Sequence, residues 1–514
     1  MTAPIIGIDL GTTNSVVSHT DEAGTVTVIT DEAGARIIPS VAHIEQGGSI
    51  VVGREALGYA TVEPQRVARV FKRGMGTPTF LPGEQPFTVD GKTWTPEELS
   101  GLVLKKLREM AEAHFDEPVT KAVITVPYYF GEPERAATRS AGVIAGLDVL
   151  QIVNEPTAAA VAHGHDRDAD DGLLLVFDLG GGTFDVTLMR HDASGGLEVI
   201  ATGGDRELGG TDFDAAILAR IAEQAREEAG ADLADDPVVL SEAVKLAEEM
   251  KMALSGRPEV TRRLTVAGKP VKVSITREEF EELIADQIQL VEDAVLVTLD
   301  KAELEGTDVT TALMVGGSSR IPVFQAMVER IVGKKPELTK NLDEDVSRGA
   351  ALLGAKLGDT LDPRSELARR PAPVDAASHA LGVTVVDVDD PSRKYNSVLI
   401  DEGTPIPHSS SHGDYSTAFD NQTEVELVLN EGADEDLDFT RTLGKSTGHF
   451  PRPVRRGHPL RFEIEYTAEQ LIKIDLFDGD SGELMTELTV EHNGMLSEDE
   501  RNAARDFLRR TDIE

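Results

Sequence analysis

The stretch that decides the fold is Gly7-Ile8-Asp9-Leu10-Gly11-Thr12-Thr13, which has a counterpart in Val176-Phe177-Asp178-Leu179-Gly180-Gly181-Gly182-Thr183. Each copy ends an apolar strand with aspartate, leucine, glycine and threonine, and each leads into a second strand. Glycines in such a loop let backbone N–H groups approach a phosphate, because no Cβ intervenes. One copy alone would indicate a tight β-turn. Two copies predict two related lobes that each offer one loop to a shared cleft.

The sequence around the two copies alternates short β-branched runs with helical patterns through residue 360, which is typical of an α/β fold. Apolar runs at 122–126 and 173–177 predict strands. Helical spacing predicts helices over 96–113, 212–229 and 237–255.

A change of composition follows at 361–378, where prolines and arginines with few apolar residues predict a linker of extended, semi-rigid character. Beyond it, alternation of apolar and polar residues predicts half-buried antiparallel strands over 423–429, 460–466 and 470–476. We expect an antiparallel β-sandwich over 379–493. A short helix is predicted over 497–510, with Ser497 and Glu500 as a capping box.

Length, charge and composition exclude several classes of protein. The 514 residues are too many for one core and carry a net charge of −41, which disfavours binding to nucleic acid. The absence of cysteine excludes disulfides and thiolate catalysis and fits a reducing compartment. The N-terminus has no basic segment of a signal peptide, and no apolar run reaches the roughly 20 residues of a membrane helix. We therefore expect a cytoplasmic protein that binds neither nucleic acid nor a membrane.

The chemistry-bearing residues lie at strand ends. Asp9, Asp178 and Asp185 can hold Mg²⁺ through its water shell, and the neighbouring threonines add hydroxyl donors. Two further glycine pairs have alternative interpretations: Gly316-Gly317 leaves room for a flat group such as adenine or forms a strand-to-helix turn, and Gly209-Gly210 fits ordinary N-capping. The P-loop and protein-kinase signatures are absent. As a set, the four glycine sites point to a phosphate-rich ligand.

Six motifs together resemble the seventy-kilodalton heat-shock (DnaK-type) chaperone family: Ile6–Ser15, Ala122–Phe130, Asn154–Ala160, Asp178–Asp185, Val315–Pro322 and Asp343–Gly354. The resemblance spans residues 4 to 500. It implies an actin-like (ribonuclease-H-like) two-lobed ATPase domain over 1–360, followed by a peptide-binding β-sandwich. It also implies ATP/ADP and Mg²⁺ as cofactors. The implied partners are apolar segments of unfolded polypeptides, a J-domain co-chaperone and a nucleotide-exchange factor.

The resemblance assigns roles to individual residues. The implied catalytic residues are Lys72, Glu155, Asp185, Thr183 and Asp9. The implied nucleotide contacts are Gly11, Thr12, Thr13, Asn14, Gly180, Gly181, Gly182, Gly209, Gly210, Glu248, Lys251, Ser255, Gly316, Gly317, Ser318, Arg320 and Asp343. Pro127 and Arg135 match the family's switch proline and its relay arginine. The residues matching the peptide cleft are Tyr415, Ala418 and Val425, although Val425 fits a sandwich core equally well.

Two departures from the family pattern are visible. The Pro- and Arg-bearing stretch 361–378 stands where the family has a short leucine-rich linker. The tail 494–514 holds one short helix in place of a long helical lid, which predicts fast exchange of bound peptide. An alternative is therefore a nucleotide-dependent regulatory protein whose β-domain recognises one specific partner. A sugar kinase or a filament-forming ATPase is disfavoured, because neither has a use for the β-domain.

Overall fold

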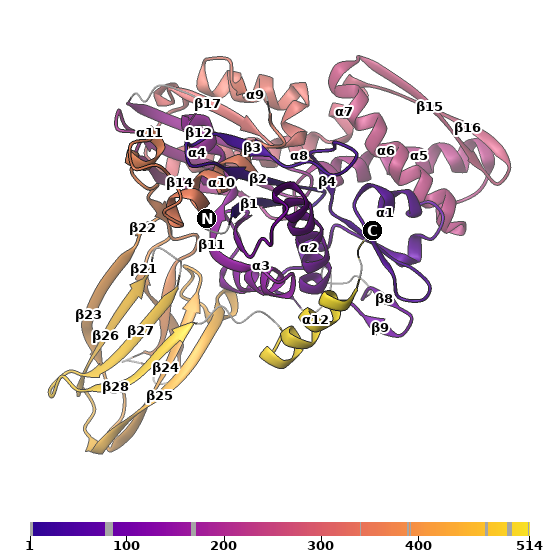
Figure 1. The fold of residues 1–514 in the computed structure, drawn as a ribbon. Helices are drawn as coiled ribbons and strands as arrows, with labels where there is room; N and C mark the ends of the chain where they lie inside the picture. The colour runs from indigo at the N-terminus through magenta and orange to yellow at the C-terminus, as the bar shows by residue number, and fades with distance from the viewer. Residues whose placement is uncertain are drawn as a thin grey trace.

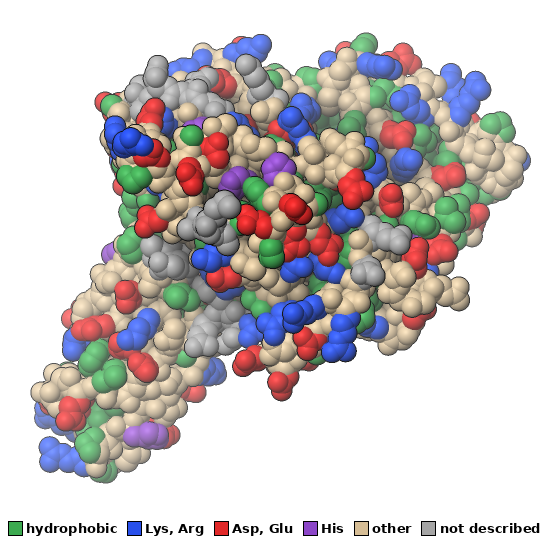
Figure 2. Space-filling model, viewed as in Figure 1, with side chains coloured by type: hydrophobic (Ala, Val, Ile, Leu, Met, Phe, Trp, Pro, Cys, Tyr) green, Lys and Arg blue, Asp and Glu red, His purple; other side chains and the backbone are tan. Residues whose placement is uncertain are grey.

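The computed structural model describes residues 4–77, 86–165, 171–339, 341–387, 390, 392–467, 471–490, 496–511 and 513. A broad α/β part carries an elongated all-β part that projects from one side (Figure 1). On the face drawn in Figure 2, acidic and basic side chains are intermixed over both parts. Within the described ranges, no helix is both long and apolar enough to cross a membrane.

The α/β part contains two large mixed sheets. The strand order of the first is β11-β10-β1-β2-β3, and that of the second is β18-β17-β12-β13-β14. In each sheet the first three strands are parallel and the last two run antiparallel to their neighbours. The bounds are β1 Ile5–Leu10, β2 Asn14–Thr20, β3 Val26–Val28, β10 Lys121–Val126, β11 Asp148–Asn154, β12 Gly172–Leu179, β13 Phe184–His191, β14 Leu197–Asp205, β17 Thr311–Val315 and β18 Glu337–Leu338.

We call residues 4–165 the first lobe and residues 171–339 the second lobe. Helices α4 (Glu155–His165) and α10 (Asp345–Leu357) pack between the two sheets in a shared core. They approach closely because glycines replace side chains at the contacts: a Cβ on Gly349 would lie 1.8 Å from the carbonyl oxygen of Ala158. This packing brings the loops after β1 and β12 to face each other across a cleft.

Most outer helices cover the remaining faces of the sheets, whereas α5 (Gly210–Ala229) and α6 (Pro237–Gly256) pack on each other and on the hairpin of β15 (Glu259–Val266) and β16 (Lys269–Thr276) (Figure 1). The ends of the helices agree with local sequence signals. Helix α2 (Pro96–Phe115) starts with a capping box between Thr95 and Glu98. The other outer helices are α3 (Glu132–Ile144), α8 (Ala285–Lys301) and α9 (Pro322–Val332). The helices predicted over 96–113, 212–229 and 237–255 are therefore confirmed with shifts of one or two residues at their ends.

The all-β part, which we call the β unit, consists of two four-stranded antiparallel sheets. Their orders are β21-β20-β24-β25 and β23-β26-β27-β28, and both contribute to one core that contains Leu429, Phe462 and Ile474. The alternating pattern of 460–466 is confirmed by strand β26, in which every second side chain is buried. The bounds are β20 Leu381–Val386, β21 Lys394–Ile400, β23 His408–Ser416, β24 Gln422–Glu431, β25 Arg441–Val454, β26 Pro459–Tyr466, β27 Ile472–Asp478 and β28 Leu484–Val490.

The segment 361–378 differs from the extended spacer that its composition predicts. It contains the short helix α11 (Glu366–Arg369) and strand β19 (Asp375–Ala376). Its backbone lies along the edge of the second sheet, since Val374 donates to Leu197 O at 2.7 Å and accepts from Val199 N at 3.1 Å. The segment is therefore held against the α/β part by backbone hydrogen bonds.

The C-terminal helix α12 (Glu498–Arg510) begins with the predicted capping box of Ser497 and Glu500. It packs on the first lobe, where Leu508 is buried and its carbonyl oxygen accepts from Lys105 Nζ at 2.8 Å. The rings of Trp94 and Phe507 also meet edge to face at 5.8 Å. The helix lies on α2 and α3, away from the two sheets of the β unit, so it does not cover that unit as a lid would (Figure 1).

Candidate active site

A cavity of about 350 Å³ lies between the two lobes. Both glycine loops line it, together with residues from α6, α10 and the turn after β17. Most residues predicted from the sequence are among its walls: Asp9, Gly11, Thr12, Thr13, Asn14, Lys72, Glu155, Asp178, Gly180, Gly181, Thr183, Glu248, Lys251, Ser255, Gly316, Gly317, Ser318, Arg320 and Asp343. Asp9 on β1 and Val315 on β17, which are 306 positions apart in sequence, thus both line this cavity.

The two glycine loops touch each other at the base of the cavity. A Cβ on Gly181 would lie 2.5 Å from Thr13 Oγ1, and one on Gly182 would lie 2.6 Å from Thr12 Cγ2. Real Cβ atoms do not come so close, so glycine is required for the loops to meet. The contact leaves backbone N–H groups and threonine hydroxyls from both lobes around one space, which suits a chain of phosphates.

A buried ion pair stands on the wall of the cavity beside the loops. Lys72 Nζ lies 2.6 Å from Glu155 Oε1, and the lysine side chain is only 3% exposed. Lys72 belongs to the first-lobe turn 71–74, and Glu155 is the first residue of α4. A charge-assisted contact this short fixes both groups, so that each is positioned for a reacting molecule in the cavity.

Two buried aspartates, Asp9 and Asp178, line the same space, and a third, Asp185, is buried outside its lining but close enough to feel the charge of Glu155. Burial, reinforced by Glu155, raises the pKa of Asp9 to about 7. The pKa values of Asp178 and Asp185 are raised well above the usual range for the same two reasons, burial first. Neither carboxylate oxygen of Asp185 has a hydrogen-bond partner of normal geometry, although the backbone N–H groups of Tyr128 and Tyr129 partly offset the rise. Such crowded acids favour a nearby cation, because positive charge stabilises their ionised form.

The donor set fits Mg²⁺ held through water. Among the residues that the structure describes, no three His, Cys, Asp or Glu side chains are close enough to ligate one metal directly. Mg²⁺ keeps several of its waters in proteins, and buried carboxylate oxygens such as those of Asp185 can accept hydrogen bonds from them.

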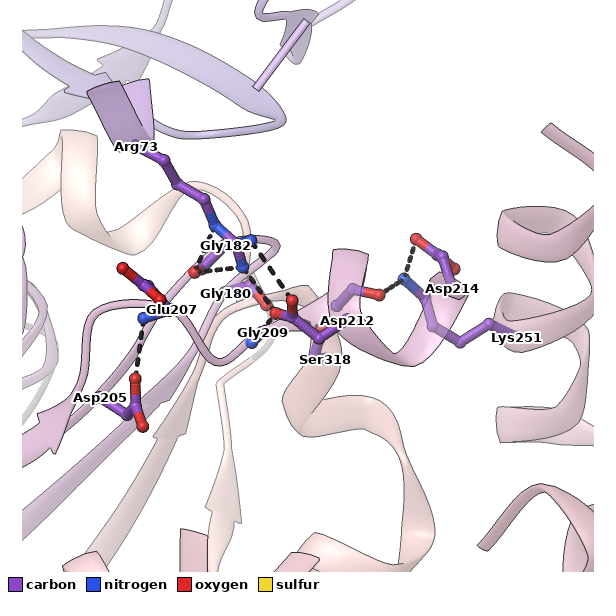
Figure 3. A network of polar contacts seen from close by, with 11 residues as sticks. Arg73, Gly180, Gly182, Asp205, Glu207, Gly209, Asp212, Asp214, Lys251 and Ser318 are labelled. Carbon is purple, nitrogen blue, oxygen red and sulfur yellow. Dashed lines mark hydrogen bonds and ion pairs between the residues drawn. The ribbon is translucent and has the colours of Figure 1, made fainter. Parts of the chain in front are cut away.

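The far end of the cavity is ordered by polar contacts (Figure 3). Lys251 Nζ donates to Asp214 Oδ2 and to Gly210 O, both at 2.8 Å, and Ser318 Oγ donates to Gly180 O at 2.9 Å. Arg320 pairs with Asp343 at 2.7 Å at the cavity edge. These contacts join α6 to the start of α5, and the turn after β17 to the second glycine loop.

Four of the predicted catalytic and nucleotide-contact residues do not line the cavity: Gly182, Asp185, Gly209 and Gly210. Gly210 N donates to Gly180 O at 3.0 Å, so the Gly209-Gly210 pair supports the second glycine loop on the side away from the cavity. A Cβ on Gly209 would meet the backbone of Gly182 at 2.7 Å, which explains the glycine without any ligand.

Sequence reasoning missed Arg73, the neighbour of Lys72. Arg73 reaches from the first lobe to the second, where Nε and Nη2 donate to Gly182 O at 3.0 and 2.7 Å (Figure 3). Nη2 also lies 2.6 Å from Asp212 Oδ2, whose carboxylate in turn accepts from Gly209 N. The motif Phe-Lys-Arg contained no signal for this role, because the partners are more than 100 residues away. Other cavity residues missed are Ile37, Thr211, Asp214, Met252, Val315, Ile321, Leu342 and Val346.

The predicted switch residues lie where the first lobe meets segment 361–378. Arg135 is 2% exposed and donates to Asn154 Oδ1 at 2.5 Å and to Ser378 Oγ at 2.9 Å. Pro127 is buried in the turn between β10 and α3, and its carbonyl oxygen accepts from Phe130 N at 3.2 Å. Asn154 directly precedes Glu155, so one hydrogen-bonded path leads from the cavity to Ser378.

The predicted peptide-cleft residues lie in the β unit. Tyr415 is half-buried, its hydroxyl is 2.7 Å from Ser397 Oγ, and its ring meets Phe462 edge to face. Val425 is also half-buried and packs against the core, whereas Ala418 is half-exposed in the turn that follows β23. Their roles in peptide binding remain predictions.

Fold and site together define an α/β protein with a phosphate-binding cleft and an attached all-β unit. Residues 5–505 match the Hsp70 protein family model. Chaperone proteins DnaK from Thermotoga petrophila and Thermotoga maritima are each 36% identical over 506 residues, which cover 96% of this chain and 82% of the relative. The chain therefore belongs to the Hsp70 family. Its function is that of an ATP-dependent chaperone, and it is an ATPase.

Proposed function

We propose that the chain hydrolyses ATP in the cavity between the lobes and uses this reaction to control binding of exposed apolar polypeptide segments by the β unit. In this proposal residues 1–360 form an actin-like (ribonuclease-H-like) ATPase domain, 361–378 the linker, 379–493 a β-sandwich and 494–514 a helical tail. The observation that carries the proposal is the buried Lys72–Glu155 pair beside two interlocked glycine loops. The absence of cysteine supports a cytoplasmic location.

Each residue of the cavity has a use in phosphoryl transfer, which depends on positioning and charge neutralisation. Glu155 polarises the attacking water, and Lys72 orients that water beside the γ-phosphate. Thr183 donates its hydroxyl to the same phosphate. Asp9, Asp178 and Asp185 would hold Mg²⁺ through its waters, and the bound ion would supply positive charge to neutralise the phosphates.

Nucleotide recognition uses the remaining walls. The threonines and glycines of the two loops surround the phosphates. Glu248, Lys251 and Ser255 of α6 contact the adenosine from one side. Gly316, Ser318, Arg320 and Asp343 contact it from the other side. Because α6 belongs to the second lobe and Lys72 to the first, a bound nucleotide bridges the lobes and favours their closure.

Coupling to the β unit runs through the buried contacts between the parts. Tyr128 donates its hydroxyl to Ala377 O at 3.0 Å, and Glu132 N donates to Glu431 Oε1 at 3.0 Å. The Glu132–Glu431 bond joins the first lobe to the β unit directly, whereas Tyr128–Ala377 and Arg135–Ser378 hold the end of segment 361–378 against the first lobe. A change at Asn154 or Pro127 on ATP binding would alter them. A J-domain co-chaperone would act on the ATPase step and a nucleotide-exchange factor on cleft opening.

The test is the affinity of a fluorescent apolar peptide for the full chain in ADP and in ATP. We expect ATP to weaken binding severalfold in the wild type. Lys72→Ala removes the catalytic lysine while the peptide site stays intact, so it should bind peptide in ADP but fail to hydrolyse ATP. Equal affinity in both nucleotides would contradict the coupling. Preference for a single sequence in a peptide library would favour the regulatory alternative.

A further inference from the structure

One methionine of the described chain differs from the others in its exposure. Met252 is 67% exposed. Met485 of β28 is half-buried, Met1 and Met495 lie outside the described residues, and the remaining methionines are at most 6% exposed: Met75, Met110, Met189, Met250, Met314 and Met327. Since the chain has no cysteine, thioethers are its only sulfur groups. Met252 is therefore the described sulfur that a dissolved oxidant reaches most easily.

This exposed thioether also lines the cavity between the lobes. It lies on α6, whose residues Glu248, Lys251 and Ser255 line the cavity too. The spacing of three and four residues between these positions places all four side chains on one face of the helix. Lys251 bonds two groups of α5, which holds this face in place. The sulfur thus stands at the solvent side of the cavity, beside the residues proposed to contact adenosine.

Oxidation changes the property of the side chain that suits a nucleobase. Methionine is flexible and polarisable, and its sulfur makes favourable contacts with aromatic rings. Methionine sulfoxide is polar. With hydrogen peroxide the sulfur lone pair attacks one peroxide oxygen, and an S–O bond forms as the O–O bond breaks. The departing hydroxide takes the proton of the transferred oxygen and leaves as water, so an electron pair has passed from sulfur to the peroxide.

We propose that Met252 is an oxidation site through which peroxide lowers the affinity of the cavity for nucleotide. The inference rests on the proposed nucleotide site and adds a means of regulating it. Oxidation places a polar S–O group beside the base, so ADP and ATP bind more weakly. A methionine sulfoxide reductase can reverse the change. The nucleotide cycle thereby responds to peroxide in a chain without cysteine.

The experiment measures the affinity of the full chain for a fluorescent ADP analogue before and after mild treatment with hydrogen peroxide. Peptide mass spectrometry measures sulfoxide at each methionine in the same samples. We expect Met252 to be oxidised first and the affinity to fall by about fivefold, which lies within the range of a contact between sulfur and an aromatic ring. Treatment with a methionine sulfoxide reductase should restore the affinity. Bound ADP should slow oxidation of Met252 but not of Met485, because nucleotide in the cavity covers only the former.

Three substitutions separate Met252 from the other methionines. Met252→Leu keeps an apolar side chain of similar volume without sulfur, so peroxide should leave its affinity at its own untreated value. Met485→Leu is the matched control, because it removes a thioether from the β unit, and peroxide should still lower its affinity by about fivefold. Met252→Gln is permanently polar and should bind the analogue about fivefold more weakly than Met252→Leu without any peroxide.

Failure of this inference and failure of the proposed function give different results. A chain that binds no ADP before treatment contradicts the proposed function and this inference together. Equal affinity before and after oxidation of Met252 overturns the inference alone. An equal loss of affinity in Met252→Leu, or faster oxidation of another described methionine, would overturn it as well.

Discussion

Replacing Arg73 by methionine should speed release of bound nucleotide. Arg73 is 9% exposed and is the first-lobe residue whose guanidinium grips both Gly182 O and Asp212 across the cleft. Methionine keeps the apolar stem but removes all four donor contacts, at 2.6 to 3.3 Å, that join the lobes. Since nucleotide leaves when the cleft opens, loss of these hydrogen bonds between the lobes lowers the barrier to nucleotide release.

The magnitude follows from the contacts. Hydrogen bonds from charged donors contribute roughly 1.5–3 kcal/mol each, and bonds that share one guanidinium do not add, so the set is worth about 2–4 kcal/mol. We assume that half of this interaction energy is already lost in the transition state for opening of the cleft. The substitution then lowers the barrier to nucleotide release by about 1–2 kcal/mol, which corresponds to release about 5- to 30-fold faster.

The assay is stopped-flow displacement of a fluorescent ADP analogue from the full chain. Arg69→Met is the matched control, because Arg69 also reaches across the cleft, to Glu248, but at 3.6 Å and with side chains 29% and 37% exposed. Exposed pairs are worth about 0–1 kcal/mol, so its release rate should rise less than about fivefold. Release within twofold of wild type in Arg73→Met, or an equal effect in Arg69→Met, would refute the reasoning.

Three further predictions concern separate parts of the molecule. Glu155→Gln keeps an acceptor for Lys72 but loses the base, so single-turnover hydrolysis should slow by about 100-fold with little change in ATP affinity; a change under threefold would contradict the role. Burial raises the pKa of Glu431 above its ordinary 4.5, so docking of the β unit should be strongest at low pH and weaken as pH rises through the raised value. Glu431→Gln should remove this dependence in scattering measurements of the radius of gyration, and a dependence that survives would argue against Glu431. Leu508→Ala should cost about 2–5 kcal/mol in urea unfolding, because the side chain is 1% exposed, whereas exposed Arg509→Ala should stay within about 0.5 kcal/mol; equal effects would mean that α12 does not stabilise the first lobe.

Local signals predicted much of the fold and of the site. The helix over 96–113 could be predicted because its apolar residues have helical spacing and a proline begins it. The paired glycine loops could be predicted because each motif is continuous in sequence. The contact that Arg73 makes across the cleft could not be predicted, since its partner Gly182 is 109 residues away in sequence. The docking of segment 361–378 depends on Arg135 and Ser378, which are 243 residues apart. Amino-acid composition shows that a segment is poor in apolar residues, but it does not predict the sheet edge with which the segment forms backbone hydrogen bonds.

The position of α12 has a consequence for biosynthesis. Lys105 and Leu508, which are bonded in the finished protein, are 403 residues apart, so at roughly 5–20 residues per second the ribosome makes the second about 20–80 s after the first. During that interval the surface of α2 and Trp94 that receives the helix is uncovered. The first lobe therefore gains the last side chains of its core, Ala504 and Leu508, only after the β unit has been synthesised. A nascent chain thus passes through a state in which the lobe that was made first still lacks part of its core.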